Sequence, residues 1–296
     1  MVALPFPKGT FLPVTTFGDK FPLDDLIRPF LFRFAPMALV SYPYATALPK
    51  RVELPLFLDS GGFAGSLAGA TYEYHEDHFA LRTPEGLLID PLGLLQLAEV
   101  HSSIRAVATL DAFIPAVIEE EQRQSRFEWT LKNAAFMVKH RKQADLFVYG
   151  SLQAWDFASG KAGTEALREI GVDGIAVGGM VPRAGRREEM GEILAGVLAG
   201  AGELPVHVFG LGQPEVVRWL FGLGVWSVDS SGYVRQAVGE RYWHADQGSY
   251  VSLAVLNPSN SCKCVVCRSG VQNFDIGGLW GKSRLALHNL NAYALK

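Results

Sequence analysis

The stretch DLFVYGSLQAWDFASGKAGTEALREIGVDGIAVGGM (145–180) contains one complete copy of the unit that predicts the fold. It begins with an apolar run, DLFVYG (145–150), passes through TEALREIG (164–171), and ends in a second apolar run, DGIAVGG (173–179). Both runs are continuous rather than alternating, which is typical of strands buried on both faces of a parallel sheet. Gly171 stands where a helix C-terminus favours a left-handed residue. The stretch therefore predicts a strand–helix–strand unit.

The same unit recurs on both sides of this stretch. The other apolar runs are MALVSY (37–42), LPLFLD (54–59), IRAVATLD (104–111), LPVHVFG (204–210) and VWSVD (225–229). The other helix-like stretches are QSRFEWTLKNAAFMVKHRK (124–142), REEMGEILAGVLAG (187–200) and PEVVRWLFGLG (214–224), the last two ending at Gly200 and Gly224. With YVSLAVL (250–256) as the eighth strand, these units predict an α/β fold of the (β/α)8 TIM-barrel type. A doubly wound open sheet is the alternative, but its Gly-rich dinucleotide fingerprint is missing after the first strand.

Length and composition set the class of protein. The chain has 296 residues, and only 19% are charged, so long disordered tails are not expected. No apolar run approaches the roughly 18 residues that cross a bilayer, so we expect no membrane partner. Prolines and Lys8 interrupt the N-terminal stretch MVALPFPKGTF, which disfavours a signal peptide and favours a cytoplasmic protein. We expect a catalytic barrel over 1–256 and a zinc-binding subdomain with a terminal helix over 257–296.

Polar residues and glycines follow the predicted strands. They are Asp59, Asp111, Gln153, Gly178, Gly179, Gly210, Gly212 and Asp229. A single Asp after a strand is often a helix cap or a turn residue. Several at successive strand ends favour a site instead, because the carboxyl ends of barrel strands meet on one face. Paired carboxylates there suit substitution at an anomeric carbon.

A flat ligand would suit the residues around these carboxylates. The glycines at 178 and 179 allow a backbone N–H to approach a planar ring, since no Cβ intervenes. Phe63 and Phe209 could supply apolar faces for such a ring, although either alone could belong to the core.

The three cysteines form a C-x-C-x2-C motif, and a histidine follows after twenty residues. Three thiolates and one imidazole hold Zn2+ in a closed, structural set, here Cys262, Cys264, Cys267 and His288. His244 is the weaker alternative to His288. The cluster HEDH (75–78) raises a second metal hypothesis, but adjacent His and acidic residues more often form a solvated rim, so we assign no metal there.

These motifs together resemble those of the tRNA-guanine transglycosylase superfamily. The matching segments are LDSGGF (58–63), TLDAF (109–113), YGSLQAW (149–155), GIAVGGMV (174–181), HVFGLGQPEVV (207–217), VWSVDSS (225–231) and the cysteine motif with its later His-Asn. The resemblance implies that Asp229 is the nucleophile and Asp59 the general acid/base. It also implies a base-binding site made of Phe63, Asp111, Gln153, Gly178, the Gly179 amide, the Met180 carbonyl and Phe209.

The resemblance further implies an activity and its partners. Members exchange guanine in a polynucleotide, tRNA or, in a shorter branch, DNA, for a 7-deazaguanine base of the preQ0, preQ1 or queuine type. Structural Zn2+ is the implied cofactor, and a homodimer is expected. A catalytically silent partner subunit of such an enzyme is one alternative. A glycoside hydrolase working with Asp59 and Asp229 is another, although it leaves the Gly-Gly-Met segment, Gln153 and the zinc motif unexplained.

The net charge of −3 does not exclude a polynucleotide, because binding needs positive potential only locally. One set of basic residues follows the expected nucleophile and continues through the zinc motif. It consists of Arg235, Arg241, Lys263, Arg268, Lys282 and Arg284.

Overall fold

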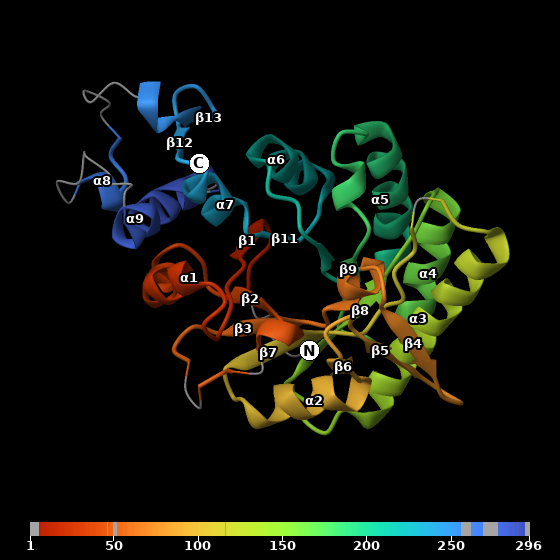
Figure 1. Ribbon diagram of the computed structural model, residues 1–296. Coiled ribbons are helices and arrows are strands. Elements are labelled where there is room, and N and C mark those ends of the chain that lie inside the picture. The colour runs from red at the N-terminus through yellow and green to blue at the C-terminus, as the bar shows by residue number, and fades with distance from the viewer. Residues whose placement is uncertain are drawn as a thin grey trace.

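The computed structural model describes residues 6–45, 47–49, 52–115, 117–255, 262–268 and 278–293. Eight parallel strands form its central sheet, in the order β1-β11-β10-β9-β8-β7-β3-β2 (Figure 1). Their bounds are β1 Thr10–Pro13, β2 Ala38–Ser41, β3 Leu56–Asp59, β7 Ile104–Ala108, β8 Phe147–Leu152, β9 Gly174–Val177, β10 Val206–Val208 and β11 Ser227–Ser230. A parallel bridge between Val14 and Leu39 joins the two edges and closes the sheet. The predicted (β/α)8 barrel is therefore confirmed.

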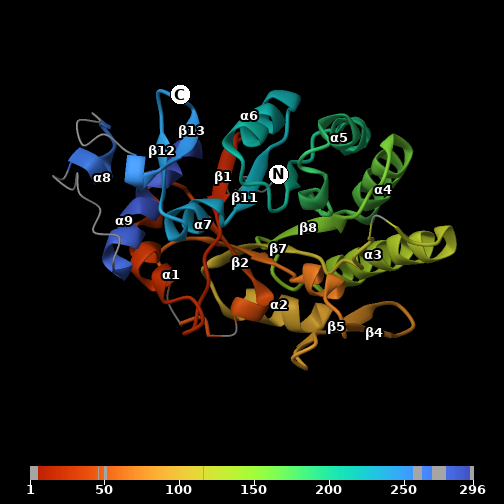
Figure 2. The same ribbon diagram turned by 45° about the horizontal axis from the view of Figure 1, so that its top comes forward.

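Helices surround the barrel (Figure 1). They are α1 Pro22–Ile27, α2 Pro91–Val100, α3 Glu120–His140, α4 Phe157–Ile170, α5 Arg187–Ala201, α6 Pro214–Leu223 and α7 Gly232–Val238. Figure 2 shows α3, α4 and α5 next to one another along one side of the sheet. Gly171 and Gly224 end α4 and α6 in the left-handed conformation, with φ of 89° and 107°, as predicted.

Gly200 does not end its helix, contrary to the prediction. Helix α5 continues to Ala201, and Gly202 follows it with φ of 60°. Gly196 and Gly200 instead face α4, where a Cβ at Gly196 would lie 2.1 Å from the Phe157 carbonyl oxygen. The two helices therefore approach too closely for any larger residue at this position.

The eighth barrel strand is also not the predicted one. YVSLAVL (250–256) was expected in the barrel, but β13 (Ser249–Ser252) pairs antiparallel with β12 (Arg241–His244) outside it. Its place is taken by β1, which pairs with β11. All four residues of β1 are buried, whereas β13 has exposed ends. The run TFLP has only four residues and ends in a proline, so it is too short for a strand period to be recognised.

Further elements extend the barrel at two places. An antiparallel sheet of β4 (Thr71–Tyr74), β5 (Phe79–Arg82) and β6 (Leu88–Ile89) is inserted between β3 and β7. Helices α8 (Val265–Arg268) and α9 (Leu279–Asn289) lie beside α1 and the β12–β13 pair (Figure 1). The 3-10 helices are η1 Arg28–Arg33, η2 Tyr42–Tyr44, η3 Gly62–Ser66, η4 Val181–Arg183, η5 Leu253–Val255 and η6 Leu290–Tyr293.

The core has two parts, one inside the barrel and one between the barrel and its helices. Leu12, Met37, Phe57, Phe147 and Tyr149 fill the barrel interior. The larger cluster includes the outward-facing strand residues and the inner helix faces. The domain boundary expected between residues 256 and 257 lies outside the described residues. Within the described ranges, no helix has the length and apolarity that a membrane span requires.

Candidate active site

A pocket of about 330 Å³ opens at the carboxyl ends of the barrel strands. Its lining includes every residue expected at the base-binding and catalytic positions except Met180. The lining residues are Leu39, Asp59, Phe63, Asp111, Phe113, Gln153, Gly178, Gly179, Val181, Pro182, Phe209, Gly210, Asp229 and Arg235. They come from β2, from the ends of six further strands and from the loops and helices that follow these strands, so the barrel topology brings residues distant in sequence into one pocket.

Asp229 lies in β11 and is almost completely buried. Its Oδ1 accepts hydrogen bonds from the Gly210 N–H at 3.0 Å and from His207 Nε2 at 3.1 Å. Gly210 has a φ of 78°, a left-handed conformation that favours glycine and aims this N–H at the carboxylate. One carboxylate oxygen is therefore held by two donors from the neighbouring strand.

Asp59 is the last residue of β3, and it lies close enough to Asp111 and Asp229 for their charges to affect its pKa. Burial, with smaller contributions from the charges of Asp229 and Asp111, raises the pKa of Asp59 to about 7, although a hydrogen bond with Ser41 opposes the shift. A carboxyl group with a pKa near 7 can both give and take a proton at neutral pH. Asp59 is therefore suited to proton transfer.

Asp111 and Gln153 form a hydrogen-bonded pair across the pocket floor. Gln153 Nε2 donates to Asp111 Oδ2 at 2.6 Å. Burial raises the pKa of Asp111, while the hydrogen bonds from Gln153 and Ser60 oppose that shift. A Cβ at Gly62 would lie 2.0 Å from Asp111 Oδ1, so the chain passes directly over the carboxylate.

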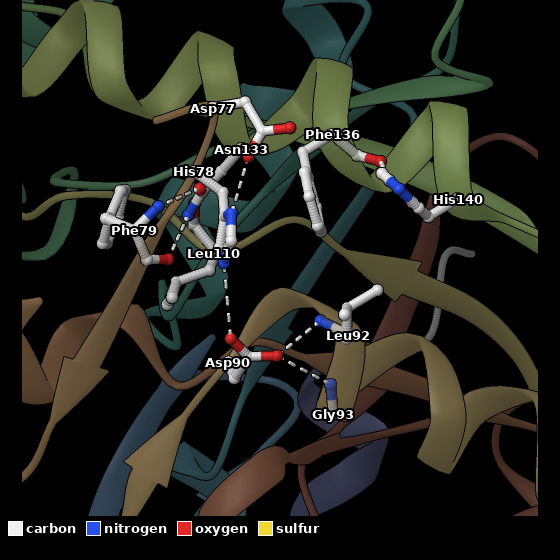
Figure 3. A network of polar contacts seen from close by, with 10 residues as sticks. All are labelled: Asp77, His78, Phe79, Asp90, Leu92, Gly93, Leu110, Asn133, Phe136 and His140. Carbon is white, nitrogen blue, oxygen red and sulfur yellow. Dashed lines mark hydrogen bonds and ion pairs between the residues drawn. The ribbon is translucent and has the colours of Figure 1, made fainter. Parts of the chain in front are cut away.

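Helix α3 holds the Asp111 segment from behind (Figure 3). Asn133 Nδ2 donates to the Leu110 carbonyl at 3.0 Å and Thr130 Oγ1 accepts from the Ala112 N–H at 3.0 Å. Asn133 also bonds both backbone groups of Phe79 in β5. These bonds on either side of position 111 fix the direction of its side chain.

The HEDH segment (75–78) lies in the same network of polar contacts (Figure 3). His78 lies between Asp77, at 2.9 Å, and Asp90, at 3.7 Å, and stacks on Phe136 (Figure 3). Asp90 caps α2 through the Leu92 and Gly93 N–H groups. Among the described residues, the grouping of side chains suited to a metal lies elsewhere, in the cysteine segment.

Aromatic rings and glycines form the walls of the pocket. Phe63 is 65% exposed and makes an edge contact with Phe113, with ring centroids 5.9 Å apart. Phe209 lies at the end of β10, partly buried against the barrel core. A Cβ at Gly178 would lie 2.7 Å from Gln153 Nε2, so there is no room for a side chain at this position, and backbone atoms line this side of the pocket.

Met180 does not line the pocket. Its side chain is fully buried, and its carbonyl accepts from the Arg183 N–H at 2.9 Å. The Gly179 carbonyl is also engaged, because Arg183 Nη1 donates to it at 2.6 Å. Arg183 in turn pairs with Glu189 at 2.7 Å, which fixes the turn between β9 and α5.

Sequence reasoning missed two residues here. His207 lies in the middle of a strand, and no local pattern shows that it contacts Asp229. Phe113 lines the pocket as well. It follows Asp111 by two residues in the sequence, and this short spacing could have indicated that it lies at the same pocket.

Comparison with known proteins places the chain in a family. The family model described as queuine tRNA-ribosyltransferase matches residues 48–294, which is most of the chain. The chain belongs to the queuine tRNA-ribosyltransferase family. The match leaves both β1 and β2 outside, whereas the pocket residues from Asp59 to Asp229 all fall within it.

Two curated relatives of this family member are similar over part of their length. A DNA-guanine transglycosylase of Salmonella montevideo is 30% identical over 191 residues, 62% of this chain and 44% of that protein. A tRNA-guanine(15) transglycosylase of Methanocaldococcus jannaschii is 24% identical over 211 residues, 68% of this chain and 32% of that protein. The matched region thus spans less than half the length of either relative.

The cysteine segment of this queuine tRNA-ribosyltransferase family member forms a four-residue cluster with His288. The Sγ atoms of Cys262, Cys264 and Cys267 lie 3.8, 3.4 and 3.5 Å from His288 Nδ1. A tetrahedral zinc ion would separate a thiolate sulfur and an imidazole nitrogen by about 3.6 Å. The donor set therefore fits a metal ion of the zinc type.

The surroundings of His288 also fit a metal ligand. His288 Nε2 contacts the Trp243 carbonyl at 2.9 Å, which places the ring proton on Nε2 and turns Nδ1 toward the sulfurs. The next residue, Asn289, bonds the Trp243 N–H and the Arg241 carbonyl. The His-Asn pair thus attaches α9 to β12, beside the barrel.

If Gly178 lines a base-binding site, as the sequence predicts, adding a methyl group there should weaken binding of the base. Gly178→Ala would place a Cβ 2.7 Å from Gln153 Nε2 and 3.3 Å from Asp111 Oδ2. Overpacking of this kind should raise the KM for guanine about tenfold. Gly185→Ala is the matched control, since a Cβ there meets nothing within 4 Å. Equal KM values for both variants in a guanine-exchange assay would contradict a base-binding role for this wall.

Proposed function

We propose that this chain is a guanine transglycosylase that exchanges guanine in a polynucleotide for a 7-deazaguanine base. The observation that carries the proposal is the convergence of Asp59, Asp111 and Asp229 with Gln153 in a pocket that Phe63 and Phe209 line. The names of both relatives, which act on guanine in DNA and in tRNA, support the same reaction class.

In this proposal the pocket reads the edge of a guanine that has left its stack. Guanine offers donors at N1 and N2 and an acceptor at O6. Asp111 supplies an acceptor beside the donating amide of Gln153, a pair matched to that edge. Phe63, largely exposed at the mouth, gives the flat ring an apolar surface.

In the proposed mechanism Asp229 is the nucleophile and Asp59 transfers the protons. Asp229 attacks C1′ of the nucleotide, the C1′–N9 bond breaks, and Asp59 gives a proton to the departing guanine. A covalent glycosyl–enzyme remains. The incoming 7-deazaguanine then attacks C1′ through N9, Asp59 takes the N9 proton, and the C1′–Asp229 bond breaks. Two inversions retain the configuration, and no energy source is required because one glycosidic bond replaces another.

The cysteine cluster takes no part in these steps. We propose that it holds Zn2+ through Cys262, Cys264, Cys267 and His288 and that the ion joins α8 to α9. Arg235 at the pocket lining, with the basic residues of the cysteine segment, would supply local positive charge for polynucleotide phosphates.

Radiolabelled-guanine exchange against bulk tRNA, duplex DNA and single-stranded DNA tests the function. Incorporation into one of these polymers is expected, and the polymer that takes up label identifies the substrate. Labelling that requires a second family member would favour the silent-subunit alternative. Failure to label any polymer, with release of sugar from oligosaccharides, would favour the glycoside hydrolase.

The raised pKa of Asp59 predicts opposite pH dependences for the two steps. Protonated Asp59 is needed when guanine leaves, so complex formation should slow about tenfold per pH unit above its pKa near 7. Deprotonated Asp59 is needed when the new base enters, so discharge should slow below that pH. Rapid-quench measurement of each step from pH 5 to 9 checks this. Two steps with parallel profiles would exclude Asp59 as the shared acid and base.

A further inference from the structure

His207 is a buried residue that neither the resemblance nor the proposed chemistry assigns. It lies in β10 and pairs in register with Ser227 of β11. Because side chains alternate along a strand, Ser227 and Asp229 face the same interior side of the barrel as His207. The imidazole is completely buried, with its ring centroid 5.1 Å from Phe57 and 4.8 Å from Phe209.

Both ring nitrogens of His207 have partners. Nε2 lies 3.1 Å from Asp229 Oδ1, and Nδ1 lies 2.8 Å from Ser227 Oγ. A carboxylate oxygen only accepts, so Nε2 carries the proton in this contact. In the neutral ring Nδ1 then accepts from the Ser227 hydroxyl. The Asp229 carboxylate therefore selects the tautomer of His207, and Ser227 holds the ring in that orientation.

The two oxygens of Asp229 are not equivalent. Oδ1 accepts from His207 and from the Gly210 N–H, at 3.1 and 3.0 Å. Within the described part of the chain no hydrogen bond uses Oδ2, although Asp229 lines the pocket. Two hydrogen bonds therefore hold Oδ1, and Oδ2 is available to a ligand in the pocket.

We propose that His207 is a positioning residue: with the Gly210 amide it holds Asp229 Oδ1, so that Oδ2 is the oxygen that attacks C1′. This inference rests on the proposed guanine exchange and names a residue of the same site. The Asp229 side chain cannot rotate to exchange its oxygens without breaking both hydrogen bonds.

The same contacts act in the second step. In the glycosyl–enzyme, Oδ2 is bonded to C1′ and Oδ1 is the carbonyl oxygen of the ester. When the incoming base attacks C1′ through N9, the C1′–Oδ2 bond breaks and its electron pair returns to the carboxylate, while the N9 proton goes to Asp59. Oδ1 regains negative charge beside two N–H donors, which makes the carboxylate a better leaving group.

Single-turnover kinetics of His207→Phe tests the inference. The ring shape is kept and both nitrogens are lost, so discharge of the covalent complex by guanine should slow about 100-fold. The KM for guanine should stay within about twofold, because His207 contacts the nucleophile and not the base. His207→Gln restores a donor and should recover discharge to within about tenfold of the natural chain.

Tyr149→Phe is the matched control, because Tyr149 also packs on Phe57 inside the barrel and its hydroxyl has no hydrogen-bond partner among the described residues. Its discharge rate should equal that of the natural chain. Folded His207→Phe with a normal rate, or His207→Gln no faster than His207→Phe, overturns the inference. If His207→Phe does not fold, Ser227→Ala decides: about tenfold slower discharge supports the inference, and a normal rate overturns it.

The two proposals fail in different ways. No guanine exchange by the natural chain on any polymer would overturn the proposed function, and the role of His207 with it. Exchange by the natural chain that His207→Phe performs equally well would overturn only the role of His207.

Discussion

Asp229→Asn is expected to abolish guanine exchange and the denaturation-resistant complex with nucleic acid. An amide in place of the attacking carboxylate cannot form the glycosyl ester, so exchange should fall by a factor of about 10⁴ or more. The amide would keep the buried volume, so the fold should remain. Denaturing gel electrophoresis of the enzyme with labelled polynucleotide measures the complex directly.

Asp156→Asn is the matched control for this substitution. Asp156 also follows a barrel strand, but it caps α4 by accepting from the Ser159 N–H, a bond that asparagine can replace. This variant should exchange guanine at the normal rate. A covalent complex that persists in Asp229→Asn but not in Asp59→Asn would move the nucleophile to Asp59.

Loss of one cysteine ligand is expected to have the second large effect. Cys264→Ala should prevent binding of the zinc ion that we propose for this cluster and lower the melting temperature by about 10 °C or more. The physical reason is that the proposed ion would connect α8 to α9, and α9 attaches to β12 through Asn289. Elemental analysis and thermal unfolding of the purified chain measure both quantities.

His244→Gln provides the control, because His244 was the weaker candidate ligand in the sequence and lies outside the four-residue cluster. This variant should retain zinc and its melting temperature. Zinc retained by Cys264→Ala but lost from His244→Gln would reverse the ligand assignment. Chelation of the natural chain should reproduce the Cys264→Ala melting curve if the metal accounts for the loss.

Much of the fold could be predicted because buried parallel strands leave continuous apolar runs such as LPVHVFG (204–210). The first barrel strand, β1, could not be predicted, because it has only four residues and ends in a proline, which is too short a run to show a strand period. The C-terminal run 250–256 is apolar in sequence, but the part of it that lies in β13 is at most half-buried and outside the barrel, and this misled the strand assignment.

The candidate site, like the fold, could be predicted only in part. Asp59, Asp111 and Asp229 stand out because charged residues directly after apolar runs are unusual in a core. The resemblance implies a base contact for the Met180 carbonyl, which stays a prediction; in the structure this carbonyl accepts from the Arg183 N–H. The role proposed for His207 could not be predicted, because it depends on the register of β10 and β11, which places His207 opposite Ser227 and which no local sequence pattern shows.

The closure of the barrel has a consequence for how the protein is made. Strand β1 pairs with β11, and Trp226 donates to the Phe6 carbonyl across 220 residues of sequence. Contacts so far apart form late, because the cost of closing a long loop must be met first. A chain still emerging from the ribosome would already contain Asp111 and Gln153, but neither Asp229 nor the strand that closes the barrel. The pocket can therefore be completed only after β11 has been synthesised.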